Sequence, residues 1–291
     1  MKKTIVAVSV AAGVLAVPTL ALAQAAPAAA APAAPASPHT FTGNAGLFSD
    51  YRFRGIDQTF GKPAFQGGFD YSHSSGFYAG NWNSNINQGA GYPGGSLEMD
   101  FYGGWKNTWG DWGLDLGAYY YYYPSTNSLN PPNLYSVANN KTGQVLSGKV
   151  DNTELYIGGS WKWVSLKYSQ AVSDYFGTPG SKNSHYLDLS GTYDLGDGWG
   201  LTGHVGGLKF KGVTNGDYTD WKIGVTKDLS GWVLGASYID TNAKGNCGAA
   251  TVANPQPYCF GNGQTNAAGT AFDKSRDAGK GTIVISVTKT F

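Results

Sequence analysis

The sequence is poor in charged residues and in cysteine. Only 13% of its 291 residues are Asp, Glu, Lys or Arg, about half of the usual ~25%. Twenty basic residues against 19 acidic ones leave a net charge of +1, so we expect no nucleic-acid partner. Two cysteines are too few for a disulfide scaffold or a structural zinc site. The mean hydropathy of −0.27 excludes a polytopic helical membrane protein.

Glycine and aromatic residues, in contrast, are abundant. Glycine occupies 43 of the 291 positions, roughly twice the usual ~7%. Aromatic residues make up 14% of the chain and include 19 Tyr and 9 Trp. Because disordered chains combine high charge with few aromatic residues, this composition predicts a folded chain.

The N-terminal segment is typical of an export signal. Two lysines precede an apolar run from Ile5 to Ala23, and the last three residues of this run fit the small-x-small cleavage rule. We therefore predict a signal peptide over residues 1–23 and a place in a bacterial envelope. An uncleaved anchor is the alternative, because the run is long enough to span a bilayer.

Residues 24–40 are almost entirely Ala and Pro. Proline at this frequency prevents a packed helix, so we predict an extended periplasmic spacer here. The remaining residues, 41–291, form the predicted folded domain.

From residue 41 onward, apolar and polar residues alternate. Leu155 and Ile157, for example, alternate with Glu154 and Tyr156, which predicts a strand with one apolar and one polar face. The same pattern recurs in twelve segments, at about 42–55, 63–74, 76–87, 96–108, 111–123, 153–163, 164–172, 184–195, 199–211, 217–228, 231–241 and 281–291.

The alternation changes parity once, at Gly206 and Gly207. Before this pair the apolar residues Leu201 and Val205 occupy odd-numbered positions, whereas beyond it Leu208 and Phe210 occupy even-numbered ones. A glycine-marked β-bulge is the expected cause.

Short and long connections alternate between the predicted strands, as they do in outer-membrane barrels. The two longest connections cover roughly residues 124–152 and 242–280. An unpaired backbone group is costly in hydrocarbon, so the first and last strands should pair and close the sheet. The predicted fold class is therefore all-β, a transmembrane antiparallel up-and-down β-barrel of about 12 strands in the bacterial outer membrane, with both termini on the periplasmic side.

Aromatic residues gather at both predicted ends of the strands. Tryptophans lie at or near the short turns, at Trp105, Trp109, Trp112, Trp161, Trp163, Trp199 and Trp232. The opposite end is predicted to carry Tyr51, Phe53, Phe60, Tyr120 and Tyr122. Two aromatic girdles imply that lipid surrounds the barrel. A soluble β-sandwich is the alternative, and it gives no reason for tryptophan to gather at one end.

Three segments carry a family resemblance: residues 49–58 (SDYRFRGIDQ), 62–72 (KPAFQGGFDYS) and 75–82 (SGFYAGNW). They resemble the TorF family of porins from proteobacterial outer membranes. The resemblance implies a β-barrel that acts as a diffusion channel and carries no catalytic residues. The C-terminal residues, which end at Phe291, resemble the signal that the barrel-assembly machinery recognises, which implies that machinery as a partner.

The polar face predicts a pore for passive diffusion of ions and small hydrophilic solutes. The residues predicted to line it are Arg52, Arg54, Asp70, Glu98, Asp100, Asp115, Glu154, Asp188, Asp220 and Lys222. Six further charged residues are also predicted to face inward: Asp50, Lys106, Lys162, Lys167, Asp194 and Lys209. The carboxylates fall near mid-barrel and the two arginines near the outer mouth. Because charged rings set ion selectivity, we predict a mild cation preference. In the alternative, these charges pair with one another and fill a narrow lumen.

Asn81, Asn83 and Asn85 are expected on the lumen face of the third predicted strand. There they would either hydrogen-bond a neutral solute or simply hydrate the lumen.

Two other classes of protein compete with a pore. A surface receptor or adhesin would use the two long loops, the first of which follows the tyrosine run 119–123. A barrel hydrolase would need a base such as His204 beside a carboxylate or Ser190. The sequence contains no phosphate-binding loop, HExxH motif or dinucleotide fingerprint. We therefore predict no cofactor, no metal and no enzymatic activity.

Cys247 and Cys259 both fall in the last long loop. The oxidising periplasm favours a disulfide between them, worth about 3 kcal/mol in the chain-entropy model. The sequence is compatible with either a monomer or an oligomer such as a trimer.

Overall fold

The computed structural model describes residues 37–87, 95–124, 126, 150–249, 254–261 and 274–291. The predicted signal peptide and most of the predicted spacer lie outside the described residues. The first strand begins at His39, two residues before the expected start of the folded domain. Within the described part of the chain, no helix is long and apolar enough to cross a membrane.

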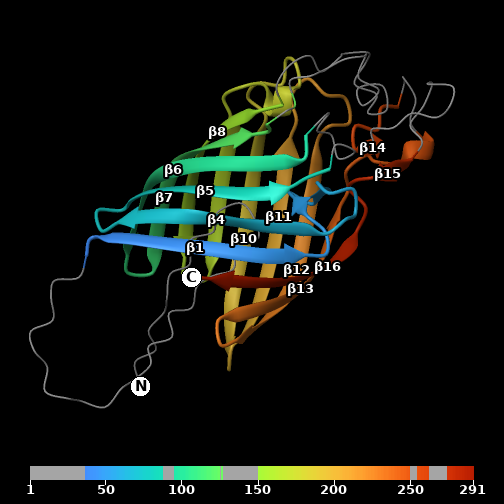
Figure 1. The fold of residues 1–291 in the computed structure, drawn as a ribbon. Helices are drawn as coiled ribbons and strands as arrows, with labels where there is room; N and C mark the ends of the chain where they lie inside the picture. The colour runs from blue at the N-terminus through green and yellow to red at the C-terminus, as the bar shows by residue number, and fades with distance from the viewer. Residues whose placement is uncertain (1–36, 88–94, 125, 127–149, 250–253, 262–273) are drawn as a thin grey trace, which may run out of the picture.

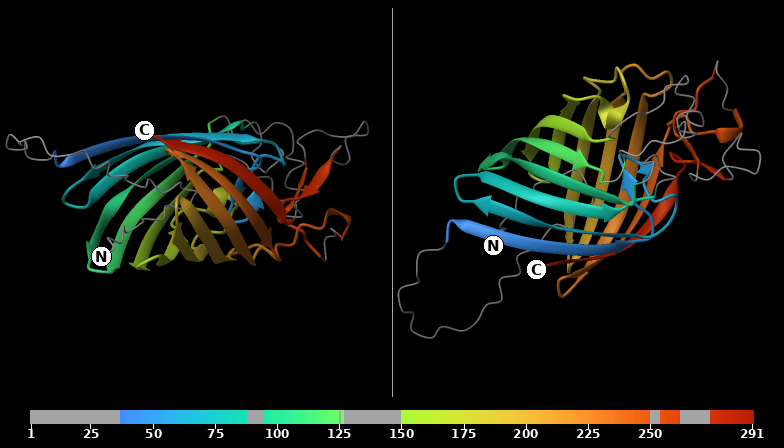
Figure 2. Two further views of the ribbon diagram at one scale, coloured as in Figure 1. Left: turned by 90° about the horizontal axis from the view of Figure 1, so that it is seen from below. Right: turned by 45° about the horizontal axis from the view of Figure 1, so that its top comes forward.

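Twelve strands form one closed antiparallel barrel (Figure 1). They are β1 (His39–Phe48), β4 (Ala64–His73), β5 (Phe77–Asn85), β6 (Leu97–Trp109), β7 (Trp112–Tyr122), β8 (Asn152–Trp161), β9 (Val164–Ala171), β10 (His185–Gly196), β11 (Trp199–Lys209), β12 (Tyr218–Leu229), β13 (Trp232–Thr241) and β16 (Thr282–Thr290). Each strand pairs with its neighbours along the barrel order, and β1 pairs with β16 (Figure 2). In this pair Leu47 lies opposite Val287. The predicted closure and strand number are confirmed.

The two faces of the barrel wall differ in polarity, as the alternation predicts. On β8, Ile157 is 52% exposed on the outer face, whereas the neighbouring Tyr156 is buried on the inner face. Large apolar side chains are exposed on the outer face of every barrel strand from β6 to β16, among them Leu116, Leu166, Leu189 and Ile283. An outer face of this kind fits hydrocarbon, so the fold is a transmembrane barrel. Exposed tryptophans at the short turns include Trp109, Trp112, Trp161, Trp163, Trp199 and Trp232.

The first predicted strand ends earlier than expected. β1 stops at Phe48, and the chain turns into the barrel interior, where β2 (Arg52–Phe53) and β3 (Ile56–Asp57) form a small hairpin. The turn between them places Arg54 and Gly55 at positive φ angles of 50° and 79°, which ends the extended conformation. The prediction of one strand over residues 42–55 was therefore wrong.

The same inward turn corrects the predicted outer girdle. Tyr51 and Phe53 belong to the segment that enters the barrel: Tyr51 is buried against Trp82 and Phe53 packs on Tyr121. Phe60 likewise lies in this segment and packs against the buried core. Of the five aromatic residues predicted for this end, only Tyr120 and Tyr122 lie on outward-facing positions of a barrel strand.

The predicted bulge at Gly206 and Gly207 does not occur. β11 pairs with β10 and β12 in unbroken register through both glycines, and the irregularity lies instead at Asp194 and Gly196 of β10. Leu208 is only 5% exposed because it faces inward. The apolar residues beyond the glycines therefore keep the inward parity and pack against segments that enter the barrel from the long-loop end.

The asparagines of β5 face outward instead of into the lumen. Asn81 lies between Phe69 and Phe101 in the pairing register, and both phenylalanines are exposed on the outer face. The Asn83 amide nitrogen donates to the side-chain oxygen of Asn81 at 2.6 Å, and the Asn81 amide donates to a backbone carbonyl of β6 at 3.0 Å. These bonds satisfy part of the polarity that faces lipid. The predicted lumen role for Asn81, Asn83 and Asn85 was wrong.

Shorter elements lie between the barrel strands at the long-loop end (Figure 1). They are the 3-10 turns η2 (Tyr175–Gly177) and η3 (Cys247–Ala249) and the paired strands β14 (Cys259–Gly261) and β15 (Ser275–Asp277). A disulfide joins Cys247 to Cys259 across this loop.

Candidate functional site

The interior of the barrel is the candidate site, and its outer half is occupied by the chain itself. We call residues 49–63, between β1 and β4, the inserted segment. Its hairpin reaches across the barrel: the Tyr218 hydroxyl on β12 donates to the Arg54 carbonyl at 2.9 Å. On the opposite side, Tyr51 packs edge-on against Trp82 of β5. The inserted segment therefore touches widely separated parts of the wall.

Arg54 connects the inserted segment to β8, which lies across the ring of strands from β1. Its two terminal nitrogens donate to the two carboxylate oxygens of Glu154 at 2.9 and 2.7 Å. The Tyr175 hydroxyl accepts a further bond at 3.0 Å, and burial raises the pKa of Tyr175 to about 12, so this partner stays neutral. The guanidinium also lies 4.3 Å from the ring centre of Tyr186. Glu154 is thus the anionic partner of this buried cation.

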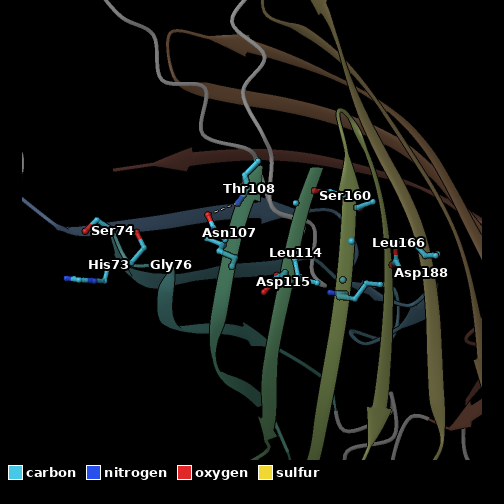
Figure 3. A pocket seen from close by; sticks show the side chains of 17 residues that line it. His73, Ser74, Gly76, Asn107, Thr108, Leu114, Asp115, Ser160, Leu166 and Asp188 are labelled. Carbon is cyan, nitrogen blue, oxygen red and sulfur yellow. Dashed lines mark hydrogen bonds between the residues drawn. The ribbon is translucent and has the colours of Figure 1, made fainter. Parts of the chain in front are cut away.

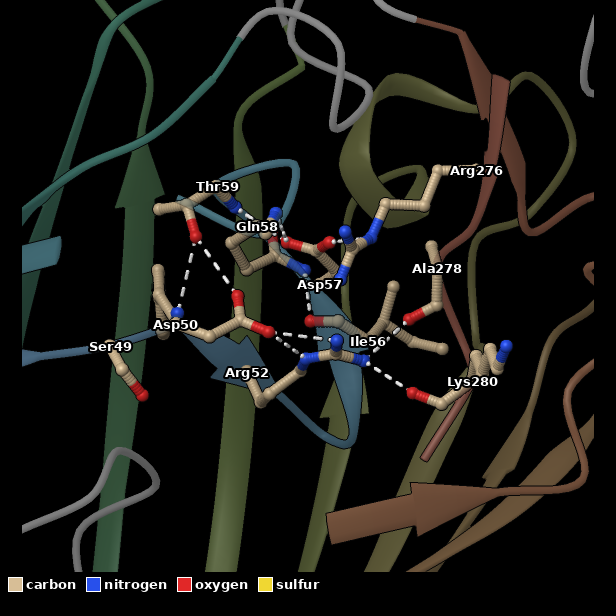
Figure 4. A network of polar contacts seen from close by, with 12 residues as sticks. Ser49, Asp50, Arg52, Ile56, Asp57, Gln58, Thr59, Arg276, Ala278 and Lys280 are labelled. Carbon is tan, nitrogen blue, oxygen red and sulfur yellow. Dashed lines mark hydrogen bonds and ion pairs between the residues drawn. The ribbon is translucent and has the colours of Figure 1, made fainter. Parts of the chain in front are cut away.

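Arg52 connects the inserted segment to the chain just before β16 (Figure 4). Its guanidinium forms an ion pair with Asp50 at 2.8 Å and donates to the carbonyls of Ala278 and Lys280 at 3.0 and 3.1 Å. Burial, together with the nearby Asp57 carboxylate, raises the pKa of Asp50 despite this ion pair. The contacts hold the base of the hairpin against the wall.

Asp57 organises the remainder of the inserted segment (Figure 4). One of its oxygens accepts bonds from the backbone nitrogens of Thr59 and Gly61 at 2.9 and 3.1 Å. The other lies 2.7 Å from the Arg276 guanidinium on β15. The segment is therefore anchored by charge at its two arginines and at Asp57.

The carboxylates of the wall accept hydrogen bonds mainly from tyrosine and histidine. The pairs are Asp70 with Tyr102 (2.6 Å), Glu98 with Tyr123 (2.8 Å), Asp115 with Tyr78 (2.6 Å) and Asp220 with both Tyr186 and His204 (2.7 Å each). Asp100 is also buried, and its Oδ1 atom has no hydrogen-bond partner among the described residues. Most of these wall carboxylates therefore have at least one oxygen bonded to a neighbouring side chain.

The inner half of the barrel, at the short-turn end, contains a cavity of about 420 Å³. Its wall is formed by polar side chains of β4, β6, β7, β8, β9 and β10, including Asp115, Ser160 and Asp188 (Figure 3). Lys106 and Lys167 also line it. This cavity has room for water or a small solute.

His204 lies in a charged cluster on the inner wall. It contacts Asp188 at 3.2 Å through Nδ1 and Asp220 at 2.7 Å through Nε2, and Ser190 Oγ lies 3.2 Å from Nδ1. The Ser190 hydroxyl, however, donates to Asp188. Its proton therefore points away from the histidine, opposite to the direction that activates a nucleophile. The geometry favours a structural role for this cluster.

The structure separates the predicted pore-lining residues into groups. Arg52 and Arg54 lie on the inserted segment, not on a barrel strand. The remaining eight occupy alternating positions on β4, β6, β7, β8, β10 and β12: Asp70, Glu98, Asp100, Asp115, Glu154, Asp188, Asp220 and Lys222. Lys209, which was also predicted to face inward, is instead exposed and forms an ion pair with Asp217.

The tyrosines that bond the wall carboxylates were not predicted as site residues. Tyr78, Tyr102, Tyr123 and Tyr186 each occupy an inward position, so strand parity alone was a usable signal. The contribution of Tyr175 had no such signal, because it lies on a connection between strands.

Comparison with known proteins gives one family and several similar structures. The Gcw_chp family, described as a bacterial protein of unknown function, matches residues 32–291. A comparison with curated proteins finds no match. The fold is similar to the KdgM porin in complex with disordered oligogalacturonate, with 6% identity and a TM-score of 0.47 over 87% of this chain and 99% of that one.

Two further porins are similar in fold. The NanC porin shares 10% identity, with a TM-score of 0.44 over 87% of this chain and 99% of that chain. A mutant Rh. blastica porin shares 13% identity, with a TM-score of 0.33 over 78% of this chain and 55% of that chain. Because the family match covers nearly all of the folded domain, the chain belongs to the Gcw_chp family.

Proposed function

We propose that the protein is an outer-membrane, porin-like channel for passive diffusion of ions and small hydrophilic solutes. One observation carries the proposal: a closed barrel with an apolar outer face encloses a polar cavity of about 420 Å³. An apolar outer face is needed in lipid, whereas a polar interior with free volume is needed only where water or solute enters.

The inserted segment forms the constriction of this channel. It crosses the outer half of the barrel, where it contacts β5, β8 and β12, and the cavity of about 420 Å³ lies on the short-turn side of it. A solute that enters from the long-loop end has to pass beside the Arg54 and Glu154 ion pair.

The membrane location and partners rest on the ends of the chain and on its outer face. The Phe291 backbone nitrogen donates to the Gly43 carbonyl at 2.8 Å, which places the exposed C-terminal ring at the barrel rim. This placement supports recognition by the barrel-assembly machinery, and the apolar face supports outer-membrane lipid as the surroundings. The signal peptide over 1–23, the periplasmic spacer and the relation to TorF porins remain parts of the proposal.

The sign of the selectivity remains a prediction. Carboxylates outnumber basic residues on the strand wall, which supports a mild cation preference for the salt current. A reversal potential measured in a salt gradient gives the sign directly.

A barrel with a filled lumen is the second candidate function, a purely structural role in the membrane. The observation that favours it is the dense packing of the inserted segment in the outer half of the barrel. A receptor role would depend chiefly on the loop of residues 124–152, most of which lies outside the described residues.

Planar-bilayer recording separates these functions. The purified, folded barrel should give discrete conductance steps, and a variant lacking residues 50–62 should give larger ones. If both proteins fold but neither conducts, the channel proposal is wrong and the filled barrel is favoured. Folding is checked by the heat-dependent shift in gel mobility that intact barrels show.

A further inference from the structure

One level of the inner wall carries a row of charged residues interrupted by a glycine. In the strand register, Lys106 lies opposite Asp115, Asp115 opposite Gly158, and Gly158 opposite Lys167. Gly158 has no side chain, so the wall is hollowed between Asp115 and Lys167. All four residues line the inner cavity.

Lys167 is the unusual member of this row. It is only 8% exposed, yet no hydrogen bond or ion pair to it occurs among the described residues. Its ammonium lies 5.4 Å from the ring centre of Tyr156, and the ammonium of Lys106 lies 5.1 Å from that of Tyr78. Aromatic faces stabilise a cation but accept no conventional hydrogen bond from it. Both ammonium groups therefore retain unused donors at the cavity.

A second row adds hydroxyl groups next to the first one. Thr108 lies opposite Gly113, Gly113 opposite Ser160, and Ser160 opposite Ser165. These residues also line the cavity, and in the described part of the chain their three hydroxyl groups have no hydrogen-bond partner. Two ammonium groups and three hydroxyl donors thus face the same space.

The carboxylates that line the cavity are bonded to other groups. Asp115 accepts from the Tyr78 hydroxyl at 2.6 Å, and Asp188 accepts from Ser190 and contacts His204 at 3.2 Å. Asp188, which lies opposite Lys167 in the register, thus has a partner for each oxygen, whereas Asp115 has one for Oδ1 alone. Most of the unpaired side-chain groups at the cavity, two ammonium groups and three hydroxyl groups, are therefore donors. A ligand that completes this site has to supply acceptor oxygens.

We propose that this cavity binds a small anion through a carboxylate or phosphate group, which Lys167 and Lys106 contact together with the hydroxyl groups of Thr108, Ser160 and Ser165. The proposal rests on the proposed channel function, because it names a solute class that enters the lumen from the short-turn end. Lys167 is the principal contact, since it is the most buried of the unpaired donors.

Binding is tested by calorimetry on the folded full-length barrel in detergent. The probes are inorganic phosphate and acetate, which distinguish a phosphate-bearing from a carboxylate-bearing solute, and glycerol is the neutral control. At least one anion should bind the unchanged protein. Lys167→Gln should weaken this binding at least tenfold and Lys106→Gln should weaken it less, whereas glycerol should not bind.

Lys227→Gln is the matched control. Lys227 lies near the same end of the barrel but on the outer face, where it stacks on Trp199 and donates to the Asp197 carbonyl at 2.6 Å. Its removal changes the net charge equally and should leave binding unchanged. Equal binding by the Lys167→Gln variant and the unchanged protein, or no binding of either anion, would overturn the inference.

The two proposals fail in different ways. A barrel that binds an anion through Lys167 but carries no current would contradict only the channel. A barrel that conducts but shows no binding dependent on Lys167 would contradict only the anion site.

Discussion

Arg54 and Glu154 form a two-pronged ion pair inside the barrel, with nitrogen–oxygen distances of 2.7 and 2.9 Å. Their side chains are only 3% and 2% exposed. The pair joins the inserted segment to the far wall, so it holds the constriction in place. Loss of either side chain would leave the other one buried without its counter-charge.

Removal of either partner should both destabilise the barrel and widen the pore. Arg54→Ala leaves Glu154 buried without its cation, which costs about 3–5 kcal/mol. We expect a lower midpoint in urea unfolding and a larger single-channel conductance. Lys62→Ala, at an exposed position of the same segment, is the control and should change neither. An unchanged conductance in a folded Arg54→Ala barrel would contradict the constriction.

The position of lipid is tested on one strand. Ile157→Arg places a charge on the outer face and should cost about 2–4 kcal/mol if that position lies near the bilayer midplane. Ser160→Arg, three residues further along β8, faces the inner cavity and should cost much less. The measurement is urea unfolding in liposomes. Equal losses for the two variants would argue against a lipid-facing surface at Ile157.

Close strand packing makes one inner glycine sensitive to substitution. A Cβ atom on Gly68 would lie 2.0 Å from the Asn81 carbonyl oxygen and 2.8 Å from the Trp82 Cα atom, both in the backbone of β5. Gly68→Ala should therefore cost about 1–3 kcal/mol of unfolding free energy. Gly159→Ala is the matched control, because no atom lies within 4 Å of its added Cβ, and its stability should be unchanged or slightly higher.

The disulfide should stabilise its loop without determining the barrel. Cys247 and Cys259 are 12 residues apart, and a closed loop of this size is worth about 3 kcal/mol in the chain-entropy model. The double variant Cys247→Ser/Cys259→Ser should be cleaved faster by protease within residues 242–261, while its gel mobility as a folded barrel is retained. The unfolded, unreduced protein should react with no thiol reagent, and labelling of either cysteine would contradict the bond.

Much of the fold was predictable because its physical cause is local. Alternating side chains, as at Leu155 and Tyr156, lie on opposite faces of any strand. Lipid outside and water or packed chain inside then fix which face is apolar. Twelve strands and their closure followed from this pattern and from the cost of unpaired backbone groups in hydrocarbon.

The sequence pattern predicted the wrong side-chain direction where an apolar residue faces the lumen or a polar residue faces lipid. Leu208 is apolar but faces inward, because the chain that enters from the long-loop end makes part of the lumen apolar. Asn83 is polar but faces outward, because a neighbouring asparagine and the backbone satisfy its amide. The chain packed against Leu208 and the Gly67 carbonyl of β4 that accepts from Asn83 both belong to other strands or loops, which no local pattern reveals.

The sequence by itself therefore determined the barrel, its closure and the two faces of its wall. Only the tertiary structure decided what the interior contains: residues 49–63 fold back across the lumen, Arg54 pairs with Glu154 one hundred residues away, and Lys167 lines a cavity without an ion pair to any described residue. The physical reason is that strand alternation depends on neighbours in the chain. The occupancy of the lumen instead depends on charges and rings brought together from distant strands once the barrel has closed.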